Sequence, residues 1–343
     1  MMLDIMEILM FLVCVLFSVA YLTVAERKTL GYLQRRLGPN AMGWYGLTQA
    51  FADAVKLLIK EMILPKESNK YMLIMSPLMT LMTALMGWVV MPLGPAMTLG
   101  DMENGILFSL AMGSLGVFGV TLSGWSSNSK YSFMGSIRST AQLMSYELVL
   151  TTIYMICMMF VSTLNMTTYM ETQRMMWLFM PLFPLFMMFF MSTMAETNRP
   201  PFDTVEAESE LVAGFFTEYS GSPFVFFFLA EYSNLMLMCA STTMLFLGGY
   251  LNFEWINNII LYPFNFMQYS FIYNFIEGSL YGMALAIKLM MLMFTFIWVR
   301  ASFPRFTYDN LINLCWLRFL PLLFAFAMLM PCILYIFNAF SFI

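Results

Sequence analysis

Residues 72–93 read MLIMSPLMTLMTALMGWVVMPL, a run without a single charged side chain. About 20 apolar residues in a helix are enough to cross the roughly 30 Å hydrocarbon core of a bilayer. Of the chain's 343 residues, 61% are hydrophobic and only 10% are charged. The sequence therefore predicts an all-α, polytopic membrane protein of about eight transmembrane helices, in which residues 1–343 form a single integral-membrane domain. The predicted spans are residues 5–25, 72–93, 104–124, 143–165, 177–195, 223–249, 280–299 and 319–342.

The basic residues support this threading, because positively charged loops stay on the cytoplasm-like side of a membrane. All but two of the 16 Lys and Arg residues fall in the connections after the first, third, fifth and seventh spans. The exceptions are Arg174 and Lys288. We expect these long basic loops on the cytoplasm-like face and both termini on the opposite face. Residues 250–279 predict a loop on that opposite face with an interfacial helix.

Several kinds of chemistry are excluded by what the sequence lacks. It contains no histidine, which removes imidazole catalysis and His-ligated metals. Its five cysteines are isolated, so no iron-sulfur, zinc or disulfide framework is indicated. A net charge of −4 gives no footprint for nucleic acid. The sequence predicts no metal site, and carboxylates, arginines and tyrosines must carry any chemistry.

The strongest local signal is the fifth connection, which begins at Glu196 and reads ETNRPPFDTVEAESE. It is strongly acidic and contains a single base, Arg199. If a helix follows the two prolines, Asp203, Glu206 and Glu210 share one face, where repulsion favours the protonated form of at least one carboxyl. A solvated acidic loop is the alternative. The flanking phenylalanines favour burial at the membrane boundary, so we predict a proton-handling role.

Glu147, Glu231 and Lys288 lie inside predicted spans, and each of the two glutamates has a tyrosine neighbour, Tyr146 and Tyr232. A charge at mid-bilayer costs roughly 2.5 to 3.5 kcal/mol, so each must face the bundle interior, pair, or be neutral. Buried ion pairs that merely orient helices are one explanation. A chain of carboxylates and tyrosines is also what a proton relay requires without histidine, and we predict such a relay.

The first connection combines a basic cluster with an amphipathic helix at about residues 49–61. Taken alone, such a segment sets topology and contacts anionic lipid. Together with other motifs, however, it resembles the NADH:ubiquinone oxidoreductase chain 1 family, from about residue 19 to 325. The matching motifs are Ala25-Glu26-Arg27-Lys28, Gly38-Pro39-Asn40, Asp53-Ala-Val-Lys56, Gly124-Trp-Ser-Ser-Asn, Ala141-Gln-Leu-Met-Ser-Tyr146-Glu147, Ala195-Glu196-Thr-Asn-Arg199, Pro201-Phe-Asp203, Glu206-Ala-Glu208-Ser-Glu210, Ala230-Glu231-Tyr232, Trp298-Val-Arg300 and Pro304-Arg305.

The resemblance implies a membrane subunit of respiratory complex I that forms the floor of a ubiquinone chamber. It implies no catalysis by this chain alone and no cofactor bound by it, with flavin and iron-sulfur clusters in partner subunits. Its partners would be the iron-sulfur subunit beside the quinone site, antiporter-like membrane subunits and lipid, in the mitochondrial inner membrane. The expected quinone-binding residues are Arg27, Arg36 and Arg300, with Trp44 and Phe224 as apolar walls. The expected proton route comprises Glu26, Asp53, Tyr146, Glu147, Glu196, Asp203, Glu206, Glu210, Glu231 and Tyr232.

Two alternatives use the same features. A proton or sodium transporter without quinone could employ the same buried acids, and a hydrogenase-complex membrane subunit could share the same loops. The chain also departs from the family pattern at Leu37, Thr307 and Leu317, where basic residues are usual. None of these three positions lies in the acidic fifth connection.

Overall fold

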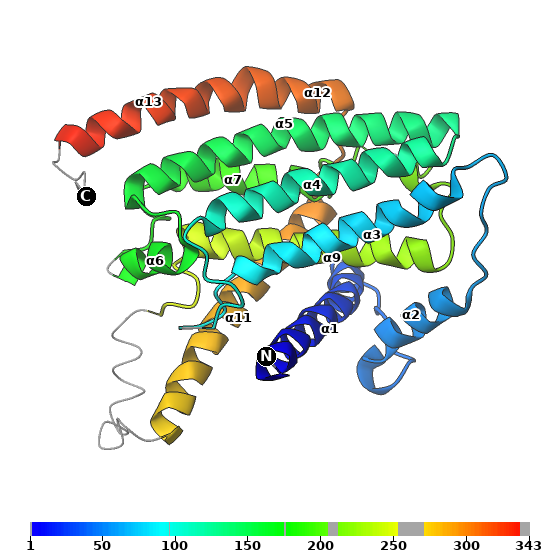
Figure 1. Cartoon of the computed structure of the whole chain (residues 1–343), viewed down its shortest axis with the longest axis horizontal. Coiled ribbons are helices and arrows are strands. Elements are labelled where there is room, and N and C mark those ends of the chain that lie inside the picture. The colour runs from blue at the N-terminus through cyan, green and yellow to red at the C-terminus, as the bar shows by residue number, and fades with distance from the viewer. Residues whose placement is uncertain (1, 96, 175, 205–211, 253–270, 337–343) are drawn as a thin grey trace.

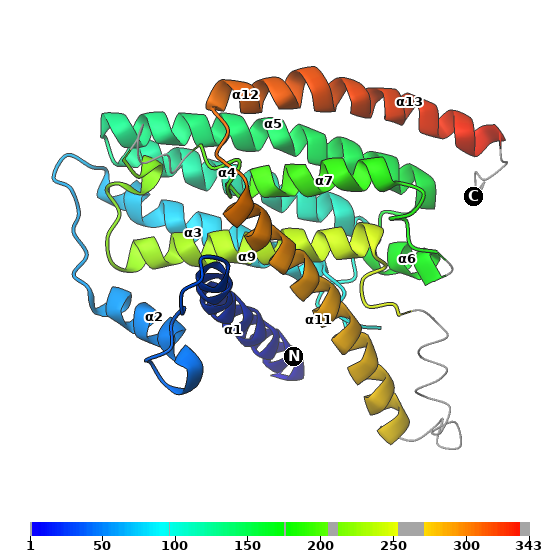
Figure 2. The ribbon, with the colours of Figure 1, turned by 180° about the vertical axis from the view of Figure 1, so that it is seen from behind.

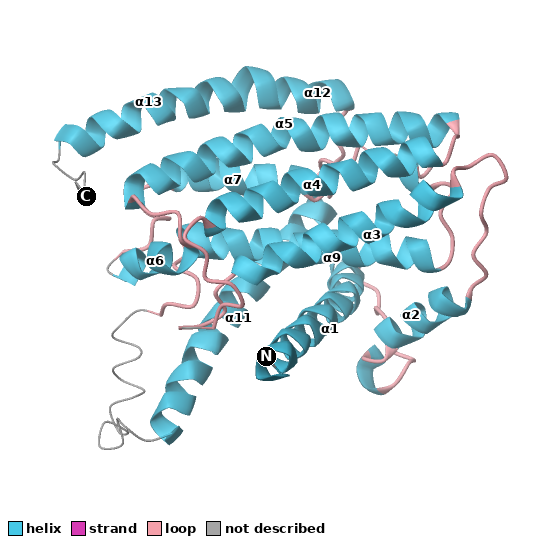
Figure 3. Cartoon of the chain, in the orientation of Figure 1, coloured by secondary structure: helices cyan, strands magenta, loops and turns pink. Residues whose placement is uncertain are grey.

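The computed structural model describes residues 2–95, 97–174, 176–204, 212–252 and 271–336. Throughout these ranges the regular elements are helices joined by loops, without a strand (Figure 3). The predicted all-α class is therefore confirmed. Seven of the described helical segments are long and apolar enough to cross a membrane, which makes the chain a polytopic membrane protein. They are Ile5–Leu33, Lys70–Val90, Gly105–Ser126, Lys130–Val161, Ser222–Phe246, Ile276–Ser302 and Tyr308–Ile336.

The elements follow one another in the order that Figure 1 labels. The longer helices are α1 (Met2–Leu33), α3 (Lys70–Gly87), α4 (Gly105–Ser126), α5 (Lys130–Val161), α7 (Phe183–Glu196), α9 (Ser222–Phe246), α11 (Phe271–Ser302) and α13 (Leu320–Ile336). The shorter ones are α2 (Gln49–Ile59), α6 (Met166–Glu171) and α12 (Tyr308–Asn313), with 3₁₀ turns at Trp44–Gly46, Trp88–Val90, Thr172–Arg174 and Gly214–Phe216 and a π-helical turn at Leu314–Phe319.

Helices α3, α4, α5, α7 and α9 lie roughly side by side, α12 and α13 run along α5, and α1 and α11 cross the bundle obliquely (Figures 1 and 2). Large apolar side chains such as Tyr154, Phe189 and Phe246 fill the centre. The predicted amphipathic helix is α2, in which only Ala50 is buried. Its exposed apolar residues, such as Phe51 and Ile59, match a helix that lies on the membrane surface.

Glycines bring α3 and α4 close together. A Cβ at Gly119 would lie 2.3 Å from Cγ2 of Thr80, and one at Gly116 would lie 3.3 Å from Oγ1 of Thr83. The same spacing places Gly113 on this side of α4, but a Cβ there would meet nothing within 4 Å. The glycine repeat thus allows close packing at one end of the helix pair and leaves space at the other.

Three predicted spans are shorter than their helices, because α1 continues to Leu33, α5 begins at Lys130 and the last helical segment begins at Tyr308. Two further boundaries need correction. The run 177–195 contains only the 14-residue helix α7, about 21 Å long, which is short of a bilayer core. Before it, the amide of Phe179 donates to the carbonyl of Phe246 at the end of α9, so the chain turns there instead of continuing a helix. Pro184 stands in the first turn of α7, the position that suits proline. The length of an apolar run therefore overestimates the length of the helix where a backbone amide is hydrogen-bonded to another part of the chain.

The second correction concerns α11, which begins at Phe271, so that residues 271–279 are helical where a loop was predicted. Backbone polar groups in an apolar environment must be hydrogen-bonded within their own segment, which favours continuing the helix beyond the minimum span. Most of the segment 250–279, for which a loop with an interfacial helix was predicted, is residues 253–270, which lie outside the described residues.

Candidate functional site

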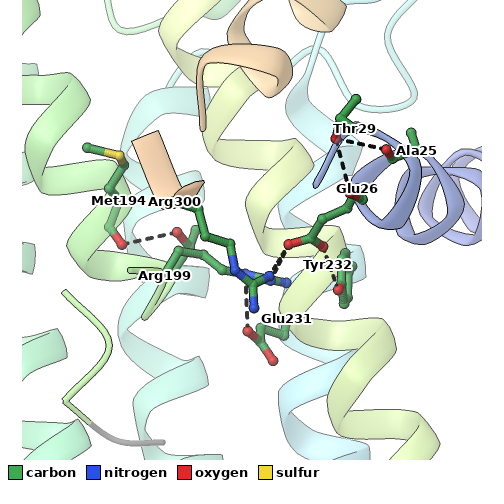
Figure 4. Close-up of polar contacts among 9 residues, drawn as sticks. Ala25, Glu26, Thr29, Met194, Arg199, Glu231, Tyr232 and Arg300 are labelled. Carbon is green, nitrogen blue, oxygen red and sulfur yellow. Dashed lines mark hydrogen bonds and ion pairs between the residues drawn. The ribbon is translucent and has the colours of Figure 1, made fainter. Parts of the chain in front are cut away.

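Five polar side chains from separate parts of the chain meet inside the bundle, and we call them the Glu26 cluster (Figure 4). Glu26 comes from α1, Arg199 from the loop after α7, and Arg300 from the last turn of α11. Glu26 accepts from Nη1 of both arginines, at 3.1 Å from Arg199, and the hydroxyl of Tyr232 donates to its other oxygen at 2.7 Å. The fifth member, Glu231, precedes Tyr232 on α9.

Arg199 is the centre of this cluster. Its Nε lies 3.4 Å from Glu231 Oε1 in an ion pair, and its guanidinium carbon lies 4.4 Å from the centre of the Tyr232 ring. Burial opposes the charged form, but the Glu231 and Glu26 carboxylates outweigh it and raise the pKa of Arg199. With two arginines and two carboxylates ionised, the cluster is neutral. A balanced set is what allows charges to be buried at acceptable cost.

The loop that carries Arg199 is held by Gln142 of α5. This amide is fully buried, and its Nε2 donates to the carbonyls of Ala195 at 2.9 Å and Phe202 at 2.8 Å. Its Oε1 accepts from the hydroxyl of Thr204 at 2.7 Å. Gln142 therefore fixes both ends of the loop, and with them the neighbouring acids.

A second anchor joins the same loop to the segment after α11. Asp203 is buried and its Oδ2 lies 3.4 Å from Nη2 of Arg305. The amide of Phe306 donates to the carbonyl of Pro201 at 2.9 Å, and the Phe306 ring stacks on Phe202 at 5.5 Å. The start of the acidic connection, at residues 201–203, is thus packed against the segment that follows α11.

A cavity of about 110 Å³ lies beside the Glu26 cluster, between α3, α4, α9 and the end of α7. Gly113 opens onto it, in agreement with the empty space beside that glycine. Its polar lining residues are Thr80, Thr83, Ser109, Glu196, Thr197, Asn198, Glu231 and Asn234. Buried water needs about 10–15 Å³ of such volume and two to four polar partners, so several molecules fit.

Two oxygens on the cavity wall have no hydrogen-bond partner in the protein, Glu196 Oε2 and Asn198 Oδ1. Buried polar atoms of this kind are normally satisfied by ordered water. Glu231 lines the cavity and also pairs with Arg199, so the cavity and the Glu26 cluster share one carboxylate. Glu147, half-buried on α5, lies close enough to Glu196 for their charges to repel. A connected set of acids thus runs from α1 to α5.

Comparison with known proteins bears on this arrangement. Residues 6–331 match the family model described as NADH dehydrogenase. The chain is 66% identical to the NADH-ubiquinone oxidoreductase chain 1 of Yarrowia lipolytica, over 99% of both chains. It is 52% identical to the protein of that name in Debaryomyces hansenii, over 98% of both chains, and 45% identical to that of Chondrus crispus, over 97% of both. The chain belongs to the NADH-ubiquinone oxidoreductase chain 1 family.

Membership of the chain 1 family confirms the resemblance drawn from the sequence motifs and makes the chain a subunit of a respiratory oxidoreductase complex. The Glu26 cluster unites three of the motifs on which that resemblance rested, those around Glu26, Arg199 and Glu231. A fourth motif, which ends at Arg300, contributes the second arginine that pairs with Glu26.

Other residues that the chain 1 resemblance nominated lie outside the Glu26 cluster. Arg27 pairs with Asp53 of α2 rather than with the cluster, so a predicted quinone contact and a predicted proton carrier bind each other. Arg36 donates to Gln34 in the loop after α1. Trp44 is 79% exposed and its ring contacts Tyr45. The roles predicted for these residues stay predictions.

Tyr146 and Phe224, which were also predicted site residues, make mainly aromatic packing contacts. Tyr146 is fully buried, donates to the carbonyl of Leu311 at 3.2 Å and packs against Phe202. Phe224 contacts Phe228, which in turn stacks on Tyr232 of the cluster. Glu206 and Glu210 lie outside the described residues, together with the predicted acidic helix.

The site contains residues that the sequence analysis did not nominate. Arg199 had a visible signal, since it is the single base of the acidic connection. Gln142, Asn198 and Asn234 carried no such signal, because an uncharged amide in a helix or loop is common wherever it stands. In the described part of the chain, three or more potential metal ligands are not grouped together anywhere.

Proposed function

We propose that this chain is the membrane subunit of mitochondrial complex I that forms part of the ubiquinone chamber and carries the acidic route coupling quinone reduction to proton translocation. The observation that carries the proposal is the sharing of Glu231 between the Glu26 cluster and the polar cavity. Glu231 contacts an arginine on one side and a cavity with room for several water molecules on the other. A change in the protonation of this carboxylate therefore affects both the charge balance of the cluster and the groups around the cavity.

The chemistry needs partners. Electrons come from flavin and iron-sulfur clusters of other subunits, and ubiquinone is the substrate. Ubiquinone that receives two electrons takes up two protons to become ubiquinol, so a reduced quinone beside this chain draws protons from nearby acids. The iron-sulfur subunit completes the chamber, and antiporter-like subunits continue the route within the mitochondrial inner membrane.

The quinone is proposed to approach the exposed side of Arg300. The hollow enclosed by Glu26, Arg199, Tyr232 and Arg300 measures about 10 Å³, room for about one water molecule. A quinone headgroup therefore stays outside it and meets the arginine whose side chain is 33% exposed. A guanidinium has five N–H donors and can bind a carbonyl oxygen while it holds Glu26.

The test uses the whole complex with Glu231→Gln, which keeps the shape of the side chain and removes its charge. We expect assembly to persist, while quinone reduction and the number of protons translocated per electron both fall in reconstituted vesicles. Glu171→Gln is the matched control, because Glu171 is exposed and pairs only loosely with Arg174, at 3.7 Å. Normal quinone reductase rate and full proton stoichiometry in Glu231→Gln would refute the proposed route.

A further inference from the structure

Lys288 of α11 lies in a cage that the proposed proton route does not use. Its Nζ donates to the carbonyls of Leu247 at 2.7 Å, Gly249 at 2.9 Å and Leu251 at 2.6 Å. The same nitrogen lies 4.5 Å from the centre of the Trp177 ring. Four groups that favour a cation therefore surround one amine inside a predicted membrane span.

The number of acceptors defines the chemical form of this amine. An ammonium has three N–H donors and a neutral amine has two, so only the ammonium satisfies all three carbonyls. The ammonium lies beside the C-terminus of α9, where the helix dipole favours a cation, and an aromatic face adds cation–π attraction. These contacts offset the cost of a charge at this depth. The three acceptors are backbone carbonyls, which are very weak bases, so these contacts hold the ammonium in place without taking its proton.

The three carbonyls around Lys288 follow directly on the C-terminus of α9, whose last carbonyls are also hydrogen-bonded by side chains. The hydroxyl of Tyr169 donates to the carbonyl of Leu245 at 3.1 Å, and Gln173 Nε2 donates to that of Met244 at 2.8 Å. Gly248 and Gly249 have φ values of 68° and 50°, which turn the chain back so that its later carbonyls reach Lys288. The terminal carbonyls of a helix need such partners when they are buried.

Lys288 lies near the middle of α11. The first turns of this helix extend beyond the other helices in both Figure 1 and Figure 2. On either side of Lys288 along the chain, Met283, Ile287 and Met290 are exposed, whereas Leu285 is buried. Towards its other end α11 packs through Phe296 on Phe190, and its last turn carries Arg300. Lys288 and Arg300 are about 18 Å apart along the helix, at about 1.5 Å per residue.

From this geometry we propose that Lys288 is a positioning residue for Arg300. Apolar contacts such as that of Phe296 are not directional, and they permit a helix to slide or rotate against its neighbours. Three hydrogen bonds from one ammonium fix the height and rotation of α11 against α9. Arg300 is thereby presented to Glu26, and the inference rests on the proposed function in that Arg300 contacts the quinone.

The experiment compares Lys288→Met and Lys288→Arg in the assembled complex, with Ile287→Met on the exposed side of α11 as the control. We expect Lys288→Met to raise the quinone KM about tenfold while kcat changes less than about twofold, because a displaced binding group weakens recognition before it affects chemistry. Lys288→Arg keeps the charge and restores most of the affinity. Ile287→Met behaves as the parent protein.

Two further measurements separate this inference from the proposed function. In a cryo-EM map of the Lys288→Met complex, Arg300 should be withdrawn from Glu26. In a double variant with Arg300→Met, the Lys288 change should add nothing to the KM of Arg300→Met alone, since it acts through that residue. If Arg300 withdraws and the KM is unchanged, the positioning role stands and the quinone contact proposed for Arg300 is wrong.

The inference is overturned if Arg300 stays on Glu26 in Lys288→Met, or if the two KM effects are additive. Lys288→Gln, which is uncharged but keeps two donors, replaces Lys288→Met in every measurement if the methionine variant does not assemble. If neither uncharged variant assembles and Lys288→Arg does, Lys288 serves assembly alone and the positioning role is refuted.

Discussion

Arg199 and Glu26 form a buried ion pair, with 3.1 Å between Nη1 and Oε1, although 173 residues separate them in the chain. The pair joins the loop after α7 to the first helix. Because Glu231 pairs with Arg199 and Arg300 pairs with Glu26, removing one member changes the charge balance of the whole cluster.

Replacing Arg199 by methionine should be the most damaging change in the cluster. It leaves Glu26 and Glu231 buried with less compensation, and breaking a buried pair in this way costs about 3–5 kcal/mol. We expect native gels to show less assembled complex. The complex that does assemble should unfold at a lower temperature. Arg174→Met is the control, since its pair with Glu171 is exposed and worth roughly 0–1 kcal/mol. Equal assembly of the two variants would contradict the central role of Arg199.

Arg300→Ala should weaken quinone recognition. Arg300 is the more accessible of the two arginines on Glu26, and Arg199 remains to balance that carboxylate. The quinone KM should rise about tenfold or more, and the affinity for quinone-site inhibitors should fall in parallel. Arg318→Ala, at an exposed position of the π-helical turn, is the matched control. An unchanged KM and inhibitor affinity in Arg300→Ala would show that this arginine contacts lipid or protein only.

Glu196→Gln should uncouple proton movement from quinone reduction. Glu196 lines the polar cavity with an unpaired oxygen, and glutamine preserves its volume but not its ability to ionise. We expect normal assembly and fewer protons pumped per electron in reconstituted vesicles. Glu67→Gln, at an exposed position of the connection between α2 and α3, should have no effect. A full proton stoichiometry in Glu196→Gln would exclude the cavity from the route.

Glu206→Gln tests the acidic connection itself. This residue belongs to the predicted cluster of carboxylates, whose repulsion makes a proton easy to share. Quinone reduction and pumping should both fall in the assembled complex. Glu208→Gln is the internal control, because the predicted helix places Glu208 on the opposite face. If the two variants have the same, normal activity, the connection is a solvated loop.

Gln142→Leu should loosen the loop that carries Arg199. The change removes the side-chain donor from the carbonyls of Ala195 and Phe202, which keep one backbone amide each, and takes the acceptor from the hydroxyl of Thr204. A buried group left unsatisfied costs about 1–3 kcal/mol. Amide hydrogen exchange should quicken in residues 196–204, and the quinone reductase rate should fall. Asn104→Leu, at an exposed position before α4 with no side-chain cap hydrogen bond, is the control. Unchanged exchange in that loop would show that packing alone holds it.

The spans were predictable because their cause is local. An uncharged run such as 72–93 has only one favourable arrangement in a bilayer, a helix that satisfies its own backbone. The same local rule overestimated the span at 177–195, where the amide of Phe179 bonds to the end of α9, and it missed the helical residues 271–279. The first error occurs where a partner distant in sequence decides the boundary, and the second where the helix continues past the minimum span to satisfy its own backbone.

The sequence by itself determined that this chain is an all-helical membrane protein whose buried acids need partners, because hydropathy and charge act on each segment separately. Only the tertiary structure decided which partners they have: Arg199 and Arg300 for Glu26, Arg27 for Asp53, and carbonyls for Lys288. A charge in an apolar medium must be balanced within a few ångströms, but the sequence does not specify which distant group packing brings there.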